Sequence, residues 1–293
     1  MTSLLKVKKL SHMGLKVKDI ETQVNFYTQM VGLGETARDE AGRVYLRCDS
    51  NHHAVVLIPS AEKDKRKALP QLDHFALDMG GQAQLDEAAR ALDQAGISYE
   101  SNLSDELGQG AALRLRDPGG FVVELVAGME QVDPYYGVRA VQPRKFQHIT
   151  LRTPHLEANV EFYTQILGFR ISDWVGENMV WLRCNPDHHS VACSRYPRTM
   201  MHHFAFEVVG MGELVQQAEH LARHDRTLLY GPGRHGPGRN LFIYYHDMEE
   251  NIIEFTADIQ QIWDDDNYVP KVWDPNKLWS NMWGPPSLPE FRR

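Results

Sequence analysis

The chain has 293 residues, a net charge of −8 and an isoelectric point near 5.9, and this acidic balance excludes the basic face of a nucleic-acid-binding protein. No apolar run approaches the roughly 20 residues of a membrane span. The N-terminus lacks the apolar region of a signal peptide, and three cysteines do not form a disulfide framework. We therefore expect a cytoplasmic protein with no nucleic-acid and no membrane partner.

The sequence contains an internal duplication. Matching positions are 136 residues apart near the start of each copy and 129 to 130 residues apart later. A repeat has to be identified first, because each copy is expected to form the same structural unit. The matching segments are 12–35 with 148–171, 45–57 with 181–193, 73–77 with 202–206, and 114–128 with 244–258. The predicted units are an N-terminal module, a C-terminal module and a tail, over residues 1–138, 139–262 and 263–293.

Within each module, short strands with alternating side chains are interrupted by two helices. The helices are expected over 21–32 and 84–96 in the first module, and over 156–168 and 213–225 in the second. The third of these stretches stops at Gly168, a normal signal for the end of a helix. This order predicts an α+β fold in which each module has two βαβββ units and a concave mixed sheet that forms a barrel-like cup.

Three strands of the second module each carry a possible metal ligand. The segment 148–153 places His148 opposite its apolar residues, and 203–208 and 251–257 do the same for His203 and Glu254. If helices cover the apolar face of the sheet, the three ligands turn towards one concave side. Two neutral imidazoles and a carboxylate form the facial triad that suits Fe(II), with Mn(II) also compatible. Residues 148–254 are therefore the predicted catalytic region.

The motif GPGRHG at 231–236 is the most specific piece of a family resemblance. His235 in this motif is followed nine residues later by Tyr244 and nineteen residues later by Glu254. With these spacings, both modules resemble the type I extradiol ring-cleaving dioxygenases of the vicinal oxygen chelate superfamily, which include catechol and homoprotocatechuate 2,3-dioxygenases. The resemblance implies a catechol-type substrate, O2 as co-substrate, and cleavage of the aromatic ring beside its two hydroxyls.

The resemblance also implies roles for single residues. His148, His203 and Glu254 correspond to the metal ligands, and His202 to a neighbour with a supporting or structural role. His189 corresponds to the acid–base histidine, although a one-residue shift of the strand would put His188 there instead. His235 and Tyr244 would hydrogen-bond the substrate oxygens. Trp181 falls where some members place a tryptophan beside the substrate, and a core tryptophan would explain it nearly as well.

The first module retains part of this pattern. His12, His74 and Glu124 match the metal ligands, and His53 matches His189. Arg114 stands at the position of Tyr244, and Asp105 or Glu106 at that of His235. We therefore expect the N-terminal module to be non-catalytic, with its triad either a metal site or a relic of the duplication.

Other positions depart from the family. Glu250 stands where a glycine is usual in the turn before the last ligand, so the loop is expected to be reshaped. Tyr230 and Thr150 replace an Arg and an Asn of homoprotocatechuate-type members, which favours a less charged or larger ring substituent. Arg195, Arg234 and Arg239 are further cations without an assigned role.

The tail contains four of the six tryptophans of the chain. Burial of such large side chains is favourable, so we expect the tail to pack across the body, either at a subunit contact or over the mouth of the active site. The resemblance implies a homo-oligomer.

Two other functions are compatible with part of the pattern. A glyoxalase-like isomerase would use the metal without O2, and a fosfomycin-resistance-like transferase also uses two histidines and a glutamate. Drug-sequestering relatives bind small molecules without catalysis. None of these alternatives accounts for His189, His235 and Tyr244 together.

Overall fold

The structure is a computed structural model that describes residues 3–60, 72–101, 106–133, 141–287 and 289–292. Asp105 and part of the segment between the modules lie outside the described residues. The N-terminal module contains β1 (Lys9–Val17), α1 (Ile20–Phe26), the π-helical turn η1 (Tyr27–Val31), β2 (Gly34–Arg38), β3 (Val44–Arg47), β4 (Val55–Pro59), β5 (Leu72–Asp78), α2 (Gln82–Ala95), β6 (Glu100–Ser101), β7 (Ala111–Arg116) and β8 (Val122–Ala127).

The C-terminal module repeats this order, and the tail adds two short elements. The module contains β9 (Lys145–Thr153), α3 (Leu156–Glu161), the π-helical turn η2 (Phe162–Ile166), β10 (Arg170–Val175), β11 (Met179–Arg183), β12 (Val191–Arg195), β13 (Met200–Glu207), α4 (Met211–Ala222), β14 (Tyr230–Arg234), β15 (Leu241–His246) and β16 (Ile252–Ala257). The tail contains β17 (Lys271–Trp273) and α5 (Pro289–Arg292). The predicted α+β fold with two βαβββ units in each module is confirmed.

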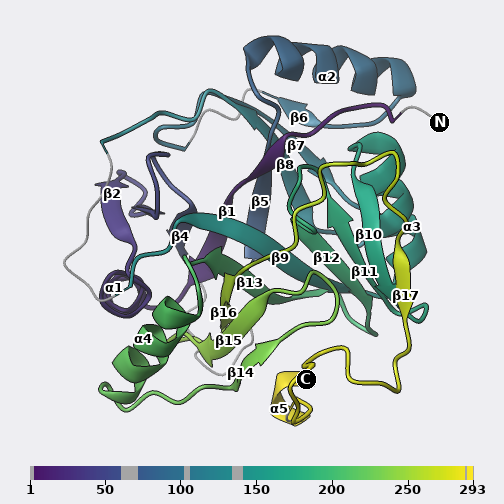
Figure 1. The fold of residues 1–293 in the computed structure, drawn as a ribbon. Coiled ribbons are helices and arrows are strands. Elements are labelled where there is room, and N and C mark those ends of the chain that lie inside the picture. Colours follow the sequence, from purple (N-terminus) through teal and green to yellow (C-terminus); the bar gives the residue numbers. More distant parts are fainter. Residues whose placement is uncertain (1–2, 61–71, 102–105, 134–140, 288, 293) are drawn as a thin grey trace.

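Each module has one mixed sheet. Among the described residues, the strand order is β2-β3-β4-β1-β5-β8-β7-β6 in the first and β14-β15-β16-β13-β9-β12-β11-β10-β17 in the second. In both, the first strands of the two βαβββ units lie side by side and antiparallel, as β1 with β5 and β9 with β13. Each of these strands is parallel to the last strand of its own unit. The middle of each sheet is therefore where the two units of a module meet (Figure 1).

The two modules are joined by a reciprocal pair of hydrogen bonds. The Tyr27 hydroxyl, in η1 of the first module, donates to Asp247 of the second at 3.0 Å. The matching Tyr163 hydroxyl, in η2 of the second module, donates to Asp117 of the first at 3.0 Å. All four side chains are buried. The tyrosine of the repeated FYTQ segment therefore hydrogen-bonds each module to the aspartate of the other module.

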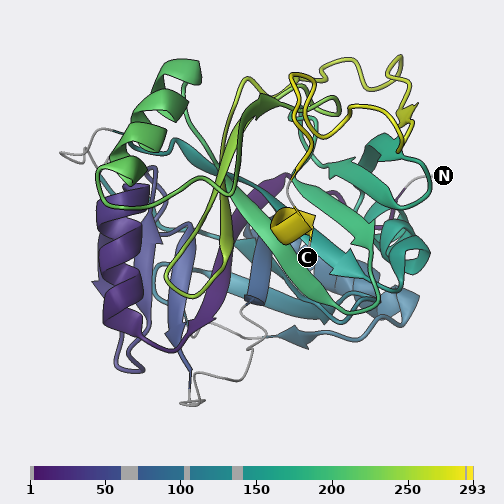
Figure 2. The ribbon, with the colours of Figure 1, turned by 90° about the horizontal axis from the view of Figure 1, so that it is seen from below.

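The hydrophobic core extends across both modules. One hydrophobic core draws buried residues from both modules, including Phe75 and Phe204, so the repeats are not separately packed bodies. Helices α1 and α4, from different modules, lie side by side in both ribbon views (Figures 1 and 2), and Gln217 of α4 donates to the Met30 carbonyl at 2.8 Å. Within the described residues, no helix is long and apolar enough to span a membrane.

The tail packs over the C-terminal module, but only part of it is buried. Strand β17 adds to the edge of the second sheet beside β10, and Figure 2 shows α5 in front of the strands of that sheet. The Trp273 indole donates to Asp173 at 2.9 Å, and Trp279 packs against Trp181. Trp263 and Trp283 remain 78% and 53% exposed. The tail therefore packs across the body through two of its four tryptophans, and the other two are largely exposed.

Candidate metal centre and substrate cavity

Three neighbouring strands bring the candidate ligands together. In the register of the sheet, Ala205 of β13 lies opposite both His148 of β9 and Glu254 of β16. His203 stands two residues before Ala205 and shares its face. Because the alanine side chain is only a methyl group, the space between the three longer side chains stays open. His148, His203 and Glu254, here called the metal triad, therefore meet above one small residue.

The metal triad is compact and buried. Glu254 Oε2 lies 3.1 Å from His148 Nε2 and 3.3 Å from His203 Nε2, and the two histidine nitrogens are 3.2 Å apart. Each side chain is at most 5% exposed. One ligand atom from each residue thus faces a common point, in a group with the composition of a metal site.

Partners behind the histidines fix which nitrogen faces that point. His148 Nδ1 donates to the Gln147 side-chain oxygen. His202 Nε2 donates to the Phe291 carbonyl at 2.8 Å, so its Nδ1 must accept from His203 Nδ1 at 2.6 Å. In both ligand histidines the proton is held at Nδ1, and Nε2 is left with a free lone pair. Such outer partners are usual for metal-bound histidines.

The Glu254 carboxylate is also oriented by a partner outside the triad. The Asn240 side-chain amide donates to Glu254 Oε1 at 3.0 Å and to the Thr256 hydroxyl at 2.7 Å. The other oxygen, Oε2, is buried without a hydrogen-bond partner among the described residues. Burial opposes ionisation of Glu254, but His148 and His203 outweigh it and hold the pKa of this carboxyl well below its usual range. A buried anionic oxygen without a donor is costly unless a cation binds it.

The residues therefore fit a divalent cation. Burial lowers the pKa of His203 to about 4, which keeps its imidazole in the neutral form that binds metals. Two neutral nitrogens and one carboxylate oxygen are the donor set of the facial triad, which suits Fe(II) and related ions and leaves positions open for other ligands.

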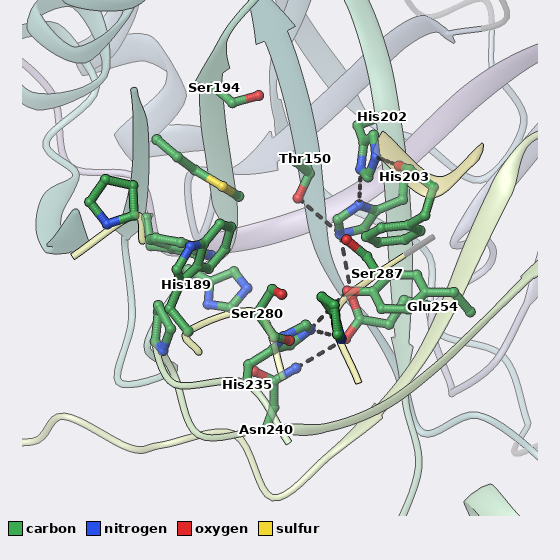
Figure 3. A pocket seen from close by; sticks show the side chains of 18 of the residues that line it. Thr150, His189, Ser194, His202, His203, His235, Asn240, Glu254, Ser280 and Ser287 are labelled. Carbon is green, nitrogen blue, oxygen red and sulfur yellow. Dashed lines mark hydrogen bonds and ion pairs between the residues drawn. The ribbon is translucent and has the colours of Figure 1, made fainter. Parts of the chain in front are cut away.

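A cavity of about 770 Å³ opens above the metal triad. Its size lies in the range of small-molecule sites. Figure 3 shows side chains of both the module and the tail around it. Beyond the triad, the lining residues singled out by the sequence are His189, His235, Tyr244, Trp181, Thr150 and His202. The structure thus brings every predicted site residue of this module to one place.

His189 lines the cavity, whereas its neighbour His188 does not. His188 Nε2 lies 3.3 Å from the Asp173 carboxylate, which favours a proton on that nitrogen. His188 Nδ1 then accepts a hydrogen bond from His189 Nδ1 at 3.1 Å. The basic nitrogen of His189 is therefore its Nε2. Burial, together with His148, lowers the pKa of His189 well below its usual value, so the ring is neutral when the cavity is empty.

His235 and Tyr244 form a connected pair beside the triad. His235 Nδ1 donates to the Ser280 carbonyl in the tail at 2.6 Å, and its Nε2 accepts from the Tyr244 hydroxyl at 2.9 Å. The imidazole also stacks on Phe242 with ring centroids 4.0 Å apart. Burial, with Glu254 nearby, raises the pKa of Tyr244 well above its usual value. The phenol therefore keeps its proton, and the tail orients the histidine.

Both aromatic and cationic side chains line the cavity. Trp181 and Trp279 meet edge to face with centroids 6.1 Å apart. Arg152, on the same face of β9 as His148, also lines the cavity and lies 4.7 Å from the Tyr196 ring centroid. Alternation along the strand puts Arg152 on the face of His148, but Arg152 was not among the predicted site residues.

Two departures from the family have structural outcomes. In the turn before Glu254, Glu250 adopts the left-handed conformation at φ 66°, and Asp247 Oδ1 accepts from the backbone of Glu249 and Asn251 at 2.8 and 2.9 Å. The aspartate thus holds Glu250 in a conformation that a glycine adopts most easily, and the reshaping of the loop stays a prediction. The side chain of Tyr230 packs against Phe242 and Phe291 and is not among the cavity-lining residues.

The first module differs from the sequence expectation. The acidic residue that joins His12 and His74 is Glu106, not Glu124. Glu124 Oε1 instead accepts from Arg114 Nε at 2.8 Å. The replacement of Tyr by Arg at position 114 thus draws the third residue of the expected triad away from the histidines.

Comparisons with known proteins agree with this architecture. Residues 9–125 and 145–255 match the Glyoxalase/Bleomycin resistance protein/Dioxygenase superfamily. Over 268 residues the chain is 28% identical to metapyrocatechase of Pseudomonas sp. (strain CF600), with 84% of each chain covered. It is 25% identical over 268 residues to the manganese-dependent 2,3-dihydroxybiphenyl 1,2-dioxygenase of Geobacillus genomosp. 3, with 82% of each covered.

A solved structure is similar over nearly the full length. The Mn(II)-bound glyoxalase from Novosphingobium aromaticivorans superposes with a TM-score of 0.87 at 27% identity, over 98% of this chain and 94% of the other. The family match covers both modules, and the two relatives named above are ring-cleaving dioxygenases. This chain therefore belongs to the Glyoxalase/Bleomycin resistance protein/Dioxygenase superfamily, with metal-type histidine and glutamate groups in both of its modules.

Proposed function

We propose that the protein is an extradiol dioxygenase, which opens the ring of a catechol-type substrate with O2. The observation that supports this most is the presence of the metal triad together with His189, His235 and Tyr244 in a single cavity. The triad alone suits many metal enzymes, whereas the three added groups supply a base and a donor beside the reacting atoms.

We propose Fe(II) as the ion, with Mn(II) as the alternative. When bound, either ion would supply Lewis-acid and redox chemistry at the triad. Glu254 Oε2, which is buried and has no hydrogen-bond partner among the described residues, would become a ligand, and the Nε2 atoms of both histidines face it already.

His235 and Tyr244 would handle the hydroxyl groups of the substrate. The Tyr244 hydroxyl, which now donates to His235 Nε2, can turn to a catechol oxygen at the cost of one hydrogen bond. His235 Nε2 is then free to accept a proton from that substrate. Its Nδ1 remains bonded to the Ser280 carbonyl, so the ring keeps its orientation while its charge changes.

His189 would act beside the ligand His148. Its basic Nε2 is neutral in the buried cavity, so it can take a proton from the substrate and return it when the O–O bond breaks. A histidine suits both steps because its intrinsic pKa lies near neutrality. The ring centroid of His189 lies 4.4 Å from that of the ligand His148.

The shape of the cavity favours a substituted ring. Trp181, Trp279 and Met179 provide an apolar wall, and aromatic pairs contribute about 0.5–1.5 kcal/mol beyond the area that they bury. We therefore propose a catechol that carries an apolar or aromatic substituent directed towards the two tryptophans.

A glyoxalase-like isomerase is the second candidate, because a glyoxalase is among the structures that superpose well. Such an enzyme would rearrange its substrate without consuming O2. An oxygen measurement therefore separates the two candidates.

The test uses the full chain loaded with Fe(II) under argon and then mixed with a panel of substituted catechols in air-saturated buffer. The dioxygenase proposal expects one O2 consumed for each catechol and a yellow ring-opened product. Omission of O2 is the control and should stop the reaction. No oxygen uptake from reduced, iron-loaded protein with any catechol would reject the proposal, and turnover of an α-keto aldehyde thiol adduct without O2 would favour the isomerase.

A further inference from the structure

Three histidines of the N-terminal module surround one buried carboxylate. His12 Nε2 lies 3.3 Å from Glu106 Oε2, His53 Nε2 lies 3.6 Å from the same oxygen, and His74 Nε2 lies 3.5 Å from Glu106 Oε1. The three histidines are at most 1% exposed, and Glu106 is 5% exposed. This group, here called the N-terminal cluster, lies outside the catalytic cavity and belongs to no step of the proposed reaction.

Each histidine of the N-terminal cluster is held from behind. His12 Nδ1 contacts the Ser11 hydroxyl at 3.1 Å, His53 Nδ1 contacts His52 at 3.0 Å, and His74 Nδ1 contacts the Asp73 carboxylate at 3.0 Å. Partners at Nδ1 orient a ring and leave Nε2 as the ligand, as in protein metal sites. All three Nε2 atoms therefore face inward.

The inward atoms have no hydrogen bonds. Nε2 of all three histidines and Oε2 of Glu106 are buried without a hydrogen-bond partner among the described residues. A direct bond between an imidazolium and a carboxylate would be shorter, about 2.7–2.9 Å. Buried polar atoms are almost always paired, so four unpaired atoms at and around one carboxylate indicate a missing partner.

The spacing around the carboxylate suits a bound ion. Two donors bound about 2.0–2.2 Å from one ion at the tetrahedral angle lie about 3.3–3.6 Å apart. His12 and His53 lie at 3.3 and 3.6 Å from Glu106 Oε2, and His74 lies at 3.5 Å from Oε1. His12, His74 and Glu106 have the mutual spacing of a metal-binding group as they stand. A group with four protein donors is typical of a structural site, since catalytic sites keep a position open.

Two substitutions between the modules conserve the charge of the site. Arg114 neutralises Glu124 through paired contacts of 2.8 and 2.5 Å, and Glu106 provides a new carboxylate. The N-terminal cluster therefore keeps one carboxylate for a cation, as the metal triad does with Glu254. Gly14 also has to lack a side chain here, because a Cβ at that position would lie 2.5 Å from the His74 ring.

We propose that the N-terminal module binds a second divalent ion, of the tetrahedral type preferred by Zn²⁺, through His12, His74 and Glu106, with His53, 3.6 Å from Glu106, moving in as the fourth ligand. The ion joins β1 and β5 to the segments that carry His53 and Glu106. Its role is to stabilise this module rather than to react with substrate.

Metal analysis of the full chain tests the proposal. After loading with Zn²⁺ and desalting, wild-type protein should hold about two ions per chain, and Glu106→Gln should hold about one. The double variant His203→Ala with Glu254→Ala, which lacks two catalytic-site donors, should also hold about one. Glu124→Gln is the matched control and should keep both ions. One ion in wild-type protein, or an unchanged count in Glu106→Gln, would overturn the proposal.

A spectrum covers the case in which Glu106→Gln does not fold. The His203→Ala, Glu254→Ala protein is titrated with Co²⁺, whose tetrahedral complexes absorb visible light much more strongly than octahedral ones. Intense bands that saturate at one ion per chain are expected. Weak bands, or no binding, would show that the cluster is not a tetrahedral site, whatever the outcome for the dioxygenase activity.

Discussion

The two modules share a fold but differ at the same two positions of their polar cluster. In the C-terminal module Tyr244 and His235 stand beside the metal triad and line an open cavity. In the N-terminal module Arg114 binds Glu124, and Glu106 lies among the histidines. The histidines are common to both modules, so they do not distinguish an open site from a closed one. The neighbours of the histidines make that difference.

The largest expected effect is the loss of activity when the Glu254 carboxylate of the second module is removed. Removal of the matching carboxylate of the first module should have no such effect. Glu254→Ala deletes the anionic ligand and should lower kcat by about 10³-fold or more, because the metal contributes several kcal/mol to the transition state. Glu124→Gln, at the matching position of the first module, should keep the wild-type kcat. Steady-state oxygen uptake with metal analysis measures both. Equal losses in the two variants would mean that catalysis is shared between the modules.

A second test separates chemistry from metal binding. His235→Asn keeps the size of the side chain but not its basic nitrogen, and should lower kcat by about 10²–10³-fold while leaving the metal content intact. His155→Asn, an exposed residue before α3, is the control. Loss of metal from His235→Asn would contradict the role given to this residue.

The tail supplies a third test. Trp279→Ala removes one face of the aromatic wall and should raise KM about tenfold for a substituted catechol, the equivalent of about 1.4 kcal/mol, with a smaller change in kcat. Trp263→Ala, whose side chain is 78% exposed, should leave both constants unchanged. If unsubstituted catechol shows the same rise in KM, the substituent does not lie against Trp279.

The reciprocal contacts between the modules can be tested one at a time. Tyr27→Phe and Tyr163→Phe each leave a buried aspartate with one donor fewer, and each should lower the free energy of unfolding by about 1–3 kcal/mol. Urea titration followed by tryptophan fluorescence measures the change. A large loss in one variant and none in the other would show that the two contacts are not equivalent.

The smallest expected effect is a pH dependence at one of these contacts. Burial raises the pKa of Asp117 to about 6 from its ordinary 3.8. The folded protein therefore holds this proton more tightly than the unfolded chain, and the stability from Asp117 is present below about pH 4 and is lost as pH rises to about 6. Asp117→Asn should flatten the stability curve in this interval. An unchanged slope in urea titrations would reject the assignment.

Periodicity along the strands was sufficient to predict the metal triad. Residues two apart share a face of a strand, so His148, His203 and Glu254 could be assigned to one face of the sheet without knowledge of the tertiary structure. Glu106 could not be assigned in this way, because it stands in a turn without alternation. The same holds for Ser280, whose carbonyl binds His235 from a segment far along the chain.

The duplication predicted the number and type of the units but not how they pack. Tyr27 and Tyr163 occupy matching places in the repeat, and nothing in either segment shows that each bonds to the other module. Likewise, burial of a tryptophan is favourable on average, but the composition of the tail did not show that Trp263 remains 78% exposed.

The exchange of tyrosines has a consequence for the history of the chain. A contact in which each half gives the same residue and receives the same residue has the form of a two-fold interface between identical subunits. A free single module would leave its tyrosine hydroxyl without this acceptor and its turn aspartate with one donor fewer, and a second copy would supply both. The chain is thus organised as a dimer within one polypeptide, and only after the two copies were fused could one site change without changing the other.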